Sequence, residues 1–183
     1  MAEPKILTHG ELLDGVADQA HVAAVDADRS QCEAVLMDPM VGRAQSEGRL
    51  DVLHVDVGAL APTGRPVGMA GIANWPAYPR APWPVWERAG AAPGLVVVMG
   101  TFRKACCLSA FMNWTGEAPL QDRRVLLRNA IGPGFDFAED LAPYFSIEAR
   151  VGGFVLLAPR PLRPGDDGSH ASFLLQRWQL DVR

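Results

Sequence analysis

The sequence has few of the features that mark secreted, membrane or nucleic-acid-binding proteins. It holds three cysteines among 183 residues, an odd number, and Cys106 and Cys107 are adjacent on a predicted helix, which suits neither a disulfide framework nor a zinc site. No apolar run approaches the roughly 20 residues that a membrane-spanning helix needs. The basic residues are scattered and the net charge is −4, so there is no basic patch for nucleic acid. We therefore expect no disulfide, no metal, no nucleic-acid partner and no membrane segment.

Two further absences concern the N-terminal region. Residues 1–5 carry no apolar signal segment, so the cytoplasm is the expected location. The glycine fingerprint of dinucleotide-binding oxidoreductases does not follow the first predicted strand, at residues 5–8, and this disfavours that class of enzyme.

What the sequence does contain is an alternation of strand and helix patterns in one globular domain, residues 1–183. Hydrophobic residues make up 49% and charged residues 21% of the chain, values typical of globular proteins with a substantial core. Strands are predicted at residues 5–8, 21–25, 50–55, 95–99 and 123–128 and in a hairpin of 144–150 and 154–158, with helices at 29–37, 102–114 and 172–180. This order predicts an α/β fold: a three-layer αβα sandwich with a mostly parallel, twisted sheet and an antiparallel C-terminal hairpin.

The centre of the pattern is a strand–turn–helix unit at residues 93–108. Leu95 to Met99 is a short run of branched apolar residues without alternation, typical of a strand buried on both faces. Gly100 ends this strand, and Thr101 is the predicted N-cap of the helix that follows. Because ligands of open α/β sheets bind at the carboxyl ends of the strands, this turn is expected at the edge of a site.

A long insertion rich in Gly, Pro and Trp lies at about residues 58–94. Structureless loops of this length are uncommon inside a domain and are usually functional, and a short helix is predicted within it at residues 84–89. Its aromatic side chains favour a small satellite core beneath the loop. The alternative is an aromatic-lined face for a substrate or partner, with Trp75 and Tyr78 as candidates.

Several motifs resemble those of class I S-adenosylmethionine-dependent methyltransferases. Val25-Asp26-Ala27-Asp28 resembles the acidic end of that family's second strand, and Leu53 to Gly58 looks like the end of its third. Residues 93–108 are similar to a bacterial methyltransferase-like branch in which the strand ends in Asp-Gly-Arg-Phe-Arg and the helix continues with Ala-Cys. The resemblance covers residues 5 to 160 and implies a Rossmann-like methyltransferase fold.

The resemblance also implies roles for particular residues in binding S-adenosylmethionine. Asp26 would accept hydrogen bonds from the ribose hydroxyls, since a carboxylate offers two acceptor oxygens to a vicinal diol. Asp56 would accept from the adenine amino group, and the backbone N–H of Val57 would donate to a ring nitrogen. Gly10 would let the first loop approach the methionine part closely. Arg103 would be an anion anchor at the rim, the alternative being an ordinary solvated residue of the first helical turn.

The chain departs from this family where the chemistry would take place. The first loop, His9 to Gly15, carries leucines and acids where small residues would admit the cofactor. Met99 and Thr101 replace the Asp and the first Arg of the bacterial branch, and Arg128-Asn129 replaces an acidic pair. The apolar framework is retained while the reacting side is altered.

One histidine and one pair of cysteines are further candidate functional residues. His9 is the one histidine near the predicted cleft, and a hydrogen-bonded loop residue is favoured over a catalytic base. For Cys106-Cys107, packing is favoured over a reactive thiol, because these residues lie on the second turn of their helix and not on the first.

Two functions remain open, and no catalytic residue is assigned. The first is a binding or scaffold domain that keeps the methyltransferase-like fold without turnover. The second is an active S-adenosylmethionine-dependent methyltransferase acting on a small molecule, in which catalysis is mainly positioning because the sulfonium is already activated. The altered first loop favours the first function. The partner, a small molecule or a protein, stays open, as does the oligomeric state, for which a homodimer is one option.

Overall fold

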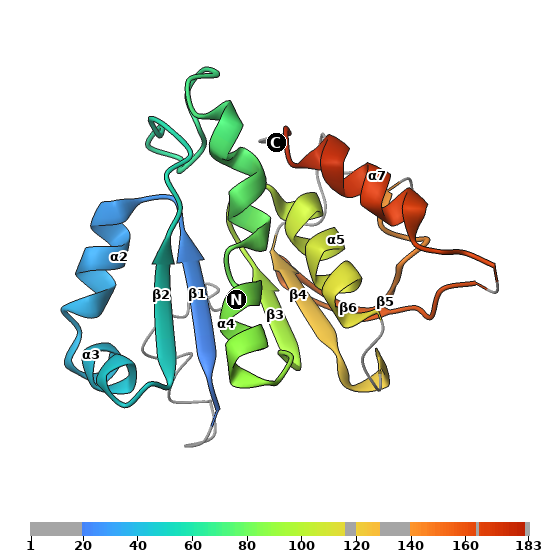
Figure 1. The fold of residues 1–183 in the computed structure, drawn as a ribbon, viewed down its shortest axis with the longest axis horizontal. Coiled ribbons are helices and arrows are strands. Elements are labelled where there is room, and N and C mark those ends of the chain that lie inside the picture. Colours follow the sequence, from blue (N-terminus) through green and yellow to red (C-terminus); the bar gives the residue numbers. More distant parts are fainter. Residues whose placement is uncertain (1–19, 116–119, 129–139, 164, 182–183) are drawn as a thin grey trace.

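A computed structural model describes residues 20–115, 120–128, 140–163 and 165–181, and it confirms a mixed α/β fold (Figure 1). The elements are β1 (Val22–Asp26), α2 (Arg29–Leu36), α3 (Pro39–Ser46), β2 (Leu50–His54), η1 (Ile72–Arg80), α4 (Trp83–Ala89), β3 (Leu95–Val98), α5 (Arg103–Trp114), η2 (Leu120–Asp122), β4 (Arg124–Arg128), β5 (Phe145–Val151), β6 (Phe154–Pro159) and α7 (Ser169–Trp178). The η elements are 3₁₀-helices.

The described strands form two hydrogen-bonded sheets. β1 and β2 are parallel, and so are β3 and β4. β6 lies between β4 and β5 and is antiparallel to both, so the C-terminal strands form the predicted antiparallel hairpin. The strand predicted at residues 5–8 lies outside the described residues, and a single three-layer sandwich that unites the two sheets stays a prediction. In Figure 1 the carboxyl ends of β1 to β4 face the top of the view.

The first two helices begin where the sequence supplies a cap. Asp28 Oδ1 accepts a hydrogen bond from the Ser30 backbone N–H at 2.8 Å, so Asp28 is the N-cap of α2. Pro39 begins the next helix, α3, with Asp38 as its N-cap. Proline is tolerated there because the first N–H groups of a helix have no intrahelical partner.

The turn between β3 and α5 differs from the prediction in two ways. The N-cap of α5 is Phe102, in the left-handed conformation with φ 57°, and the Thr101 hydroxyl donates instead to the Gly64 carbonyl at 3.1 Å. The expectation of a strand buried on both faces is wrong at its ends, since Leu95 is 52% and Met99 40% exposed. Val98 is buried, because α5 packs against this part of the strand.

The apolar interior of the described part of the chain consists of one large and one small cluster. The large cluster gathers β3, β4, β6, α5 and α7 around residues such as Phe111 and Leu127. It also includes Trp75 and Trp83, so the tryptophans of the insertion belong to the main core and not to a satellite. The insertion is therefore ordered, and its helix α4 matches the prediction at residues 84–89. No helix within the described residues has the length and apolarity needed to cross a membrane.

Candidate functional site

The carboxyl ends of β1 and β2 carry the acidic residues that the sequence singled out. Asp26 is the last residue of β1, and Asp56 and Val57 follow β2. The predictions for His9 and Gly10 lie outside the described residues. The described part of the candidate site is therefore the edge where β1, β2 and β3 end.

Each of the two carboxylates uses one oxygen to close its own turn. Asp26 Oδ1 accepts from the Asp28 backbone N–H at 2.8 Å, and Asp56 Oδ1 accepts from the Gly58 backbone N–H at 2.9 Å. Such bonds to the backbone two residues ahead are typical of aspartates in turns. Described residues make no hydrogen bond to the second oxygen of either carboxylate. Each aspartate thus retains one acceptor oxygen for a ligand.

Residues 58–80, which we call the strap, run over these strand ends (Figure 1, teal to green at the top). The strap begins as a small loop closed by an antiparallel bridge between Leu60 and Pro66. It returns to the end of β2 at Gly71, where an added Cβ would lie 2.0 Å from the Val57 carbonyl oxygen. Because real Cβ atoms do not approach a carbonyl oxygen so closely, the contact requires glycine.

Two aromatic side chains of the strap bind the backbone at the strand ends. Trp75 Nε1 donates to the Val57 carbonyl at 2.9 Å, and the Tyr78 hydroxyl donates to the Val25 carbonyl at 3.3 Å. The Tyr78 oxygen also lies 3.5 Å from the position that a Cβ on Gly100 would take. The Tyr78 hydroxyl is therefore placed between the end of β1 and the turn after β3, where ligands bind in open α/β folds.

The Tyr78 hydroxyl is a donor over the whole physiological pH range. Burial, reinforced by the negative charge of Asp26, raises the pKa of Tyr78 far above its usual value of 10.0. A neutral phenol is the form that can donate to a backbone carbonyl. Tyr78 therefore acts here as a fixed hydrogen-bond donor.

Phe102 joins the strap to the turn before α5. Its ring centroid lies 5.7 Å from that of Trp75 and 5.5 Å from that of Tyr78. The residue is only 1% exposed, and it is the one non-glycine residue with positive φ among the described residues. A left-handed conformation in a bulky residue costs on the order of 1–3 kcal/mol and persists only where packing enforces it. The two strap rings supply part of that packing.

Arg103 is half-buried and not fully solvated. Its Nη1 donates to the Arg128 carbonyl at 3.3 Å. Burial, with repulsion from Arg65, lowers the pKa of Arg103. Two guanidinium groups therefore lie near the start of α5. An anion anchor at this position stays a prediction.

The cysteines carry no sign of reactivity. All three are free, and burial raises the pKa of Cys106 to about 12 and raises that of Cys107 as well. Thiols with raised pKa values stay protonated at neutral pH and are poor nucleophiles. This agrees with a packing role for the pair.

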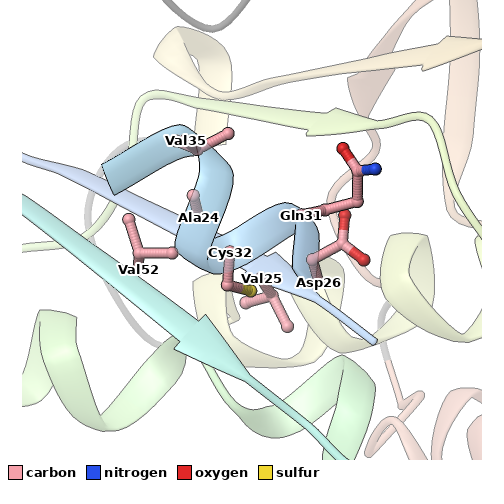
Figure 2. Close-up of a pocket in the computed structure, with 7 residues that line it drawn as sticks. All are labelled: Ala24, Val25, Asp26, Gln31, Cys32, Val35 and Val52. Atoms are coloured by element: carbon pink, nitrogen blue, oxygen red, sulfur yellow. The ribbon is translucent and has the colours of Figure 1, made fainter. Parts of the chain in front are cut away.

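Figure 2 shows a cavity on the α2 side of β1 and β2, with Asp26 and Gln31 at its polar end. Its volume is about 50 Å³. Ligand pockets are usually roughly 300–1,000 Å³, so this cavity has room for a few water molecules and not for a nucleoside. Its lining is completed by Ala24, Val25, Cys32, Val35 and Val52.

The part of the chain that the structure describes contains no group of three His, Cys, Asp or Glu side chains that could hold a metal ion. The residues that sequence reasoning missed are Gly71 and Phe102. Gly71 stands in a segment with many glycines, and nothing in the sequence separates it from the others. Phe102 lies in the Phe-Arg-x-Ala-Cys motif, but its left-handed backbone has no signal in the sequence.

The fold resembles that of a solved protein. The crystal structure of a methyltransferase-like protein from Silicibacter pomeroyi DSS-3 matches with a TM-score of 0.62 and 21% sequence identity, over 88% of this chain and 77% of that chain. No protein-family model and no curated protein sequence matches the chain. The similarity supports a methyltransferase-like fold.

Proposed function

We propose that this chain is a methyltransferase-like domain that acts by binding a partner and does not transfer a methyl group. The observation that carries the proposal is that Tyr78 and Trp75 hold the backbone carbonyls at the ends of β1 and β2. These are the strand ends at which a nucleotide-type cofactor of such a fold would lie.

The donor set suits S-adenosylmethionine only in part. The free oxygens of Asp26 and Asp56 match a ribose diol and an adenine amino group in chemistry. The strap, however, lies against the same strand ends, with the Gly71 backbone packed on the Val57 carbonyl. In this conformation the described residues do not fit the cofactor. The sequence changes at Met99 and Thr101, beside the same edge, agree with a loss of turnover.

The partner would meet the outer surface of the strap. Val67 is 56% and Met69 63% exposed there, whereas Trp75 is 3% exposed and faces the core. Exposed apolar side chains, methionine among them, adapt well to a protein or small-molecule surface. The aromatic rings therefore shape this surface from below and do not form its contact face.

The second candidate function is an active methyltransferase with a small acceptor. It is favoured by the unused carboxylate oxygens and by Arg103 at the rim, which together could position a cofactor once the strap has moved. In that case the chain would need to supply orientation more than acid–base chemistry, because methyl transfer from a sulfonium depends mainly on near-attack geometry.

A titration with S-adenosylhomocysteine followed by thermal unfolding separates the two functions. Ligand at 100 times its dissociation constant stabilises a protein by about 2.7 kcal/mol. We expect no shift in melting temperature at millimolar ligand. A saturable shift that Asp26→Ala weakens, and that the distant helix-cap variant Asp38→Ala leaves unchanged, would overturn the proposal and favour the methyltransferase.

A further inference from the structure

We propose that the strap is an autoinhibitory closure, and that lifting it from the strand ends admits a diol-bearing nucleoside to Asp26 and Asp56. The inference rests on the proposed function in one respect: the closed strap is taken as the reason why the domain binds no cofactor in its resting state. It adds that the closure is reversible and is controlled by a few identifiable contacts.

The first argument is that few polar contacts hold the strap to the strand ends. Two side-chain hydrogen bonds, from Trp75 and Tyr78, bind it to β2 and β1, and the Thr101 hydroxyl binds its loop at Gly64. Within η1, Pro76 and Pro79 lack backbone N–H groups, which limits its internal hydrogen bonding. The last residues of the strap are held separately, because the Pro79 carbonyl accepts from Trp83 Nε1 at 3.0 Å and from the Ser109 hydroxyl at 2.7 Å. Opening at the strand ends, with the Pro79 end still bound, is therefore expected to cost less free energy than opening the main core.

The second argument is that the closed state stores strain. Phe102 is kept in the left-handed conformation while the rings of Trp75 and Tyr78 pack on it. When the strap lifts, this packing is lost and Phe102 is free to leave the unfavourable backbone region. Trp75 is part of the main core in the closed state. Relief of the Phe102 strain offsets part of the cost of exposing Trp75, which favours a two-state element at this edge.

The third argument is that polar groups suited to a ligand lie beneath the strap. Asp26 and Asp56 each retain an oxygen without a hydrogen bond from the described residues. The Val25 and Val57 carbonyls would lose their aromatic donors on opening. The uncovered edge would be rich in acceptors, and a nucleoside offers hydroxyl and amino donors to such an edge.

Gly71→Ala is the variant designed to open the strap. The new Cβ would lie 2.0 Å from the Val57 carbonyl oxygen and 2.3 Å from its carbon, so the strap must move away from β2. Gly94→Ala is the matched control, because its Cβ would meet nothing closer than the Asp122 carbonyl oxygen at 3.9 Å. Both variants add one methyl group at a glycine.

The readouts are amide hydrogen exchange over residues 72–80 and calorimetric titration with S-adenosylhomocysteine. We expect Gly71→Ala to speed exchange in η1 at least tenfold and to give saturable binding, and Gly94→Ala to do neither. Exchange unchanged in Gly71→Ala, or faster exchange without binding, would overturn the proposal.

A second variant keeps the test decisive if Gly71→Ala does not fold. Tyr78→Phe retains the ring and removes only the hydroxyl that donates to Val25. Loss of one hydrogen bond should speed exchange in η1 about fivefold and bring measurable binding. If Tyr78→Phe exchanges and binds as the wild type does, the closure is not controlled by this contact and the proposal fails.

The same titration separates this inference from the proposed function. Suppose that the wild type binds S-adenosylhomocysteine and that amide hydrogen exchange in η1 becomes faster on ligand addition. The wild-type domain then binds the cofactor product, and the strap opens to admit it. In that case the proposed function fails and the strap proposal stands. If the wild type binds with η1 fully protected, both fail. If no variant binds, the strap proposal fails and the non-catalytic function stands.

Discussion

The two sheets are stabilised in different ways. Among the described residues around β1 and β2, with α2 and α3, the buried apolar cluster consists of Val41, Ala44 and Leu50, and the rest of both strands is only half-buried. Around β3 to β6, with α5 and α7, the large cluster includes side chains that are fully removed from solvent, such as Phe111 and Leu127. The described residues of the first region therefore contribute much less hydrophobic stabilisation than those of the second.

The ion pairs of the two regions also differ in burial. In the first region Arg43 pairs with Glu47 at 2.7 Å on the exposed surface, a kind of ion pair that contributes little. In the second, Lys104 Nζ pairs with Asp140 at 2.5 Å in the interior and lies 3.7 Å from the centroid of the Trp178 ring. A buried pair of this kind is intolerant of losing one partner.

The strap connects the two regions, and this explains its position. Trp75 is part of the large core, while its indole N–H and the Tyr78 hydroxyl bind the ends of β2 and β1. The strap thereby links the carboxyl ends of β1 and β2, which have a small apolar cluster, to the large core around β3 to β6. The same fastening covers the edge at which a ligand would bind.

The largest expected effect compares two leucine-to-alanine changes. Leu127→Ala should destabilise the protein by close to the upper end of the range for buried leucines, about 5 kcal/mol, because its side chain is fully enclosed. Leu50→Ala should cost about 2 kcal/mol, since the small cluster can collapse around it. Denaturant unfolding of both variants checks this. Equal losses would mean that the two regions are equally well packed.

The next effect concerns the buried ion pair. Asp140→Asn removes the negative charge that lies against the buried Lys104 ammonium and should cost about 3 kcal/mol. Glu47→Gln on the surface should cost roughly 0.5 kcal/mol or less. Thermal unfolding of the two variants gives the two losses of stability, which can then be compared. A loss at Asp140 no larger than that at Glu47 would show that the interior of the second region is accessible to water.

The smallest effect is a pH dependence at the start of α2, in the first region. Hydrogen bonds from Ser30, with its hydroxyl as the main donor, lower the pKa of Asp28 below its ordinary value of 3.8. A lowered folded-state pKa gives a stabilisation that is complete above the unfolded-state value and is lost as the pH falls through the folded-state value. Amide protection in α2 should therefore decrease below about pH 4. Asp28→Asn keeps the cap but has no charge to titrate, so the same decrease in that variant would assign the effect to another group.

Most of the elements could be predicted from the sequence, because their signals are local. Asp28 identifies the start of α2, and the run from Leu95 to Val98 identifies β3. Pro39 is ambiguous in the sequence, because proline suits both the end of a helix and its first turn, and only the preceding Asp38 cap distinguishes the two. The tertiary contact between Thr101 and Gly64 removed the predicted cap of α5 and could not be inferred from neighbouring residues.

For the candidate site, the sequence predicts which residues lie at the strand ends but not how the strap contacts them. The strand-end positions of Asp26 and Asp56 follow from strand length and the alternation of elements. That Tyr78 and Trp75 would reach back to these strand ends depends on the path of the strap, which is set by the Gly71 contact and the packing of Phe102. Both are long-range features without a periodic signal.

The central claim is that the closed strap and a nucleoside ligand compete for the same strand ends. Its most direct test is calorimetric titration of wild-type protein and Gly71→Ala with S-adenosylhomocysteine, side by side at one temperature and ionic strength. The account predicts no heat of binding for the wild type and a saturable heat for the variant. Saturable binding of equal affinity by both proteins would contradict it.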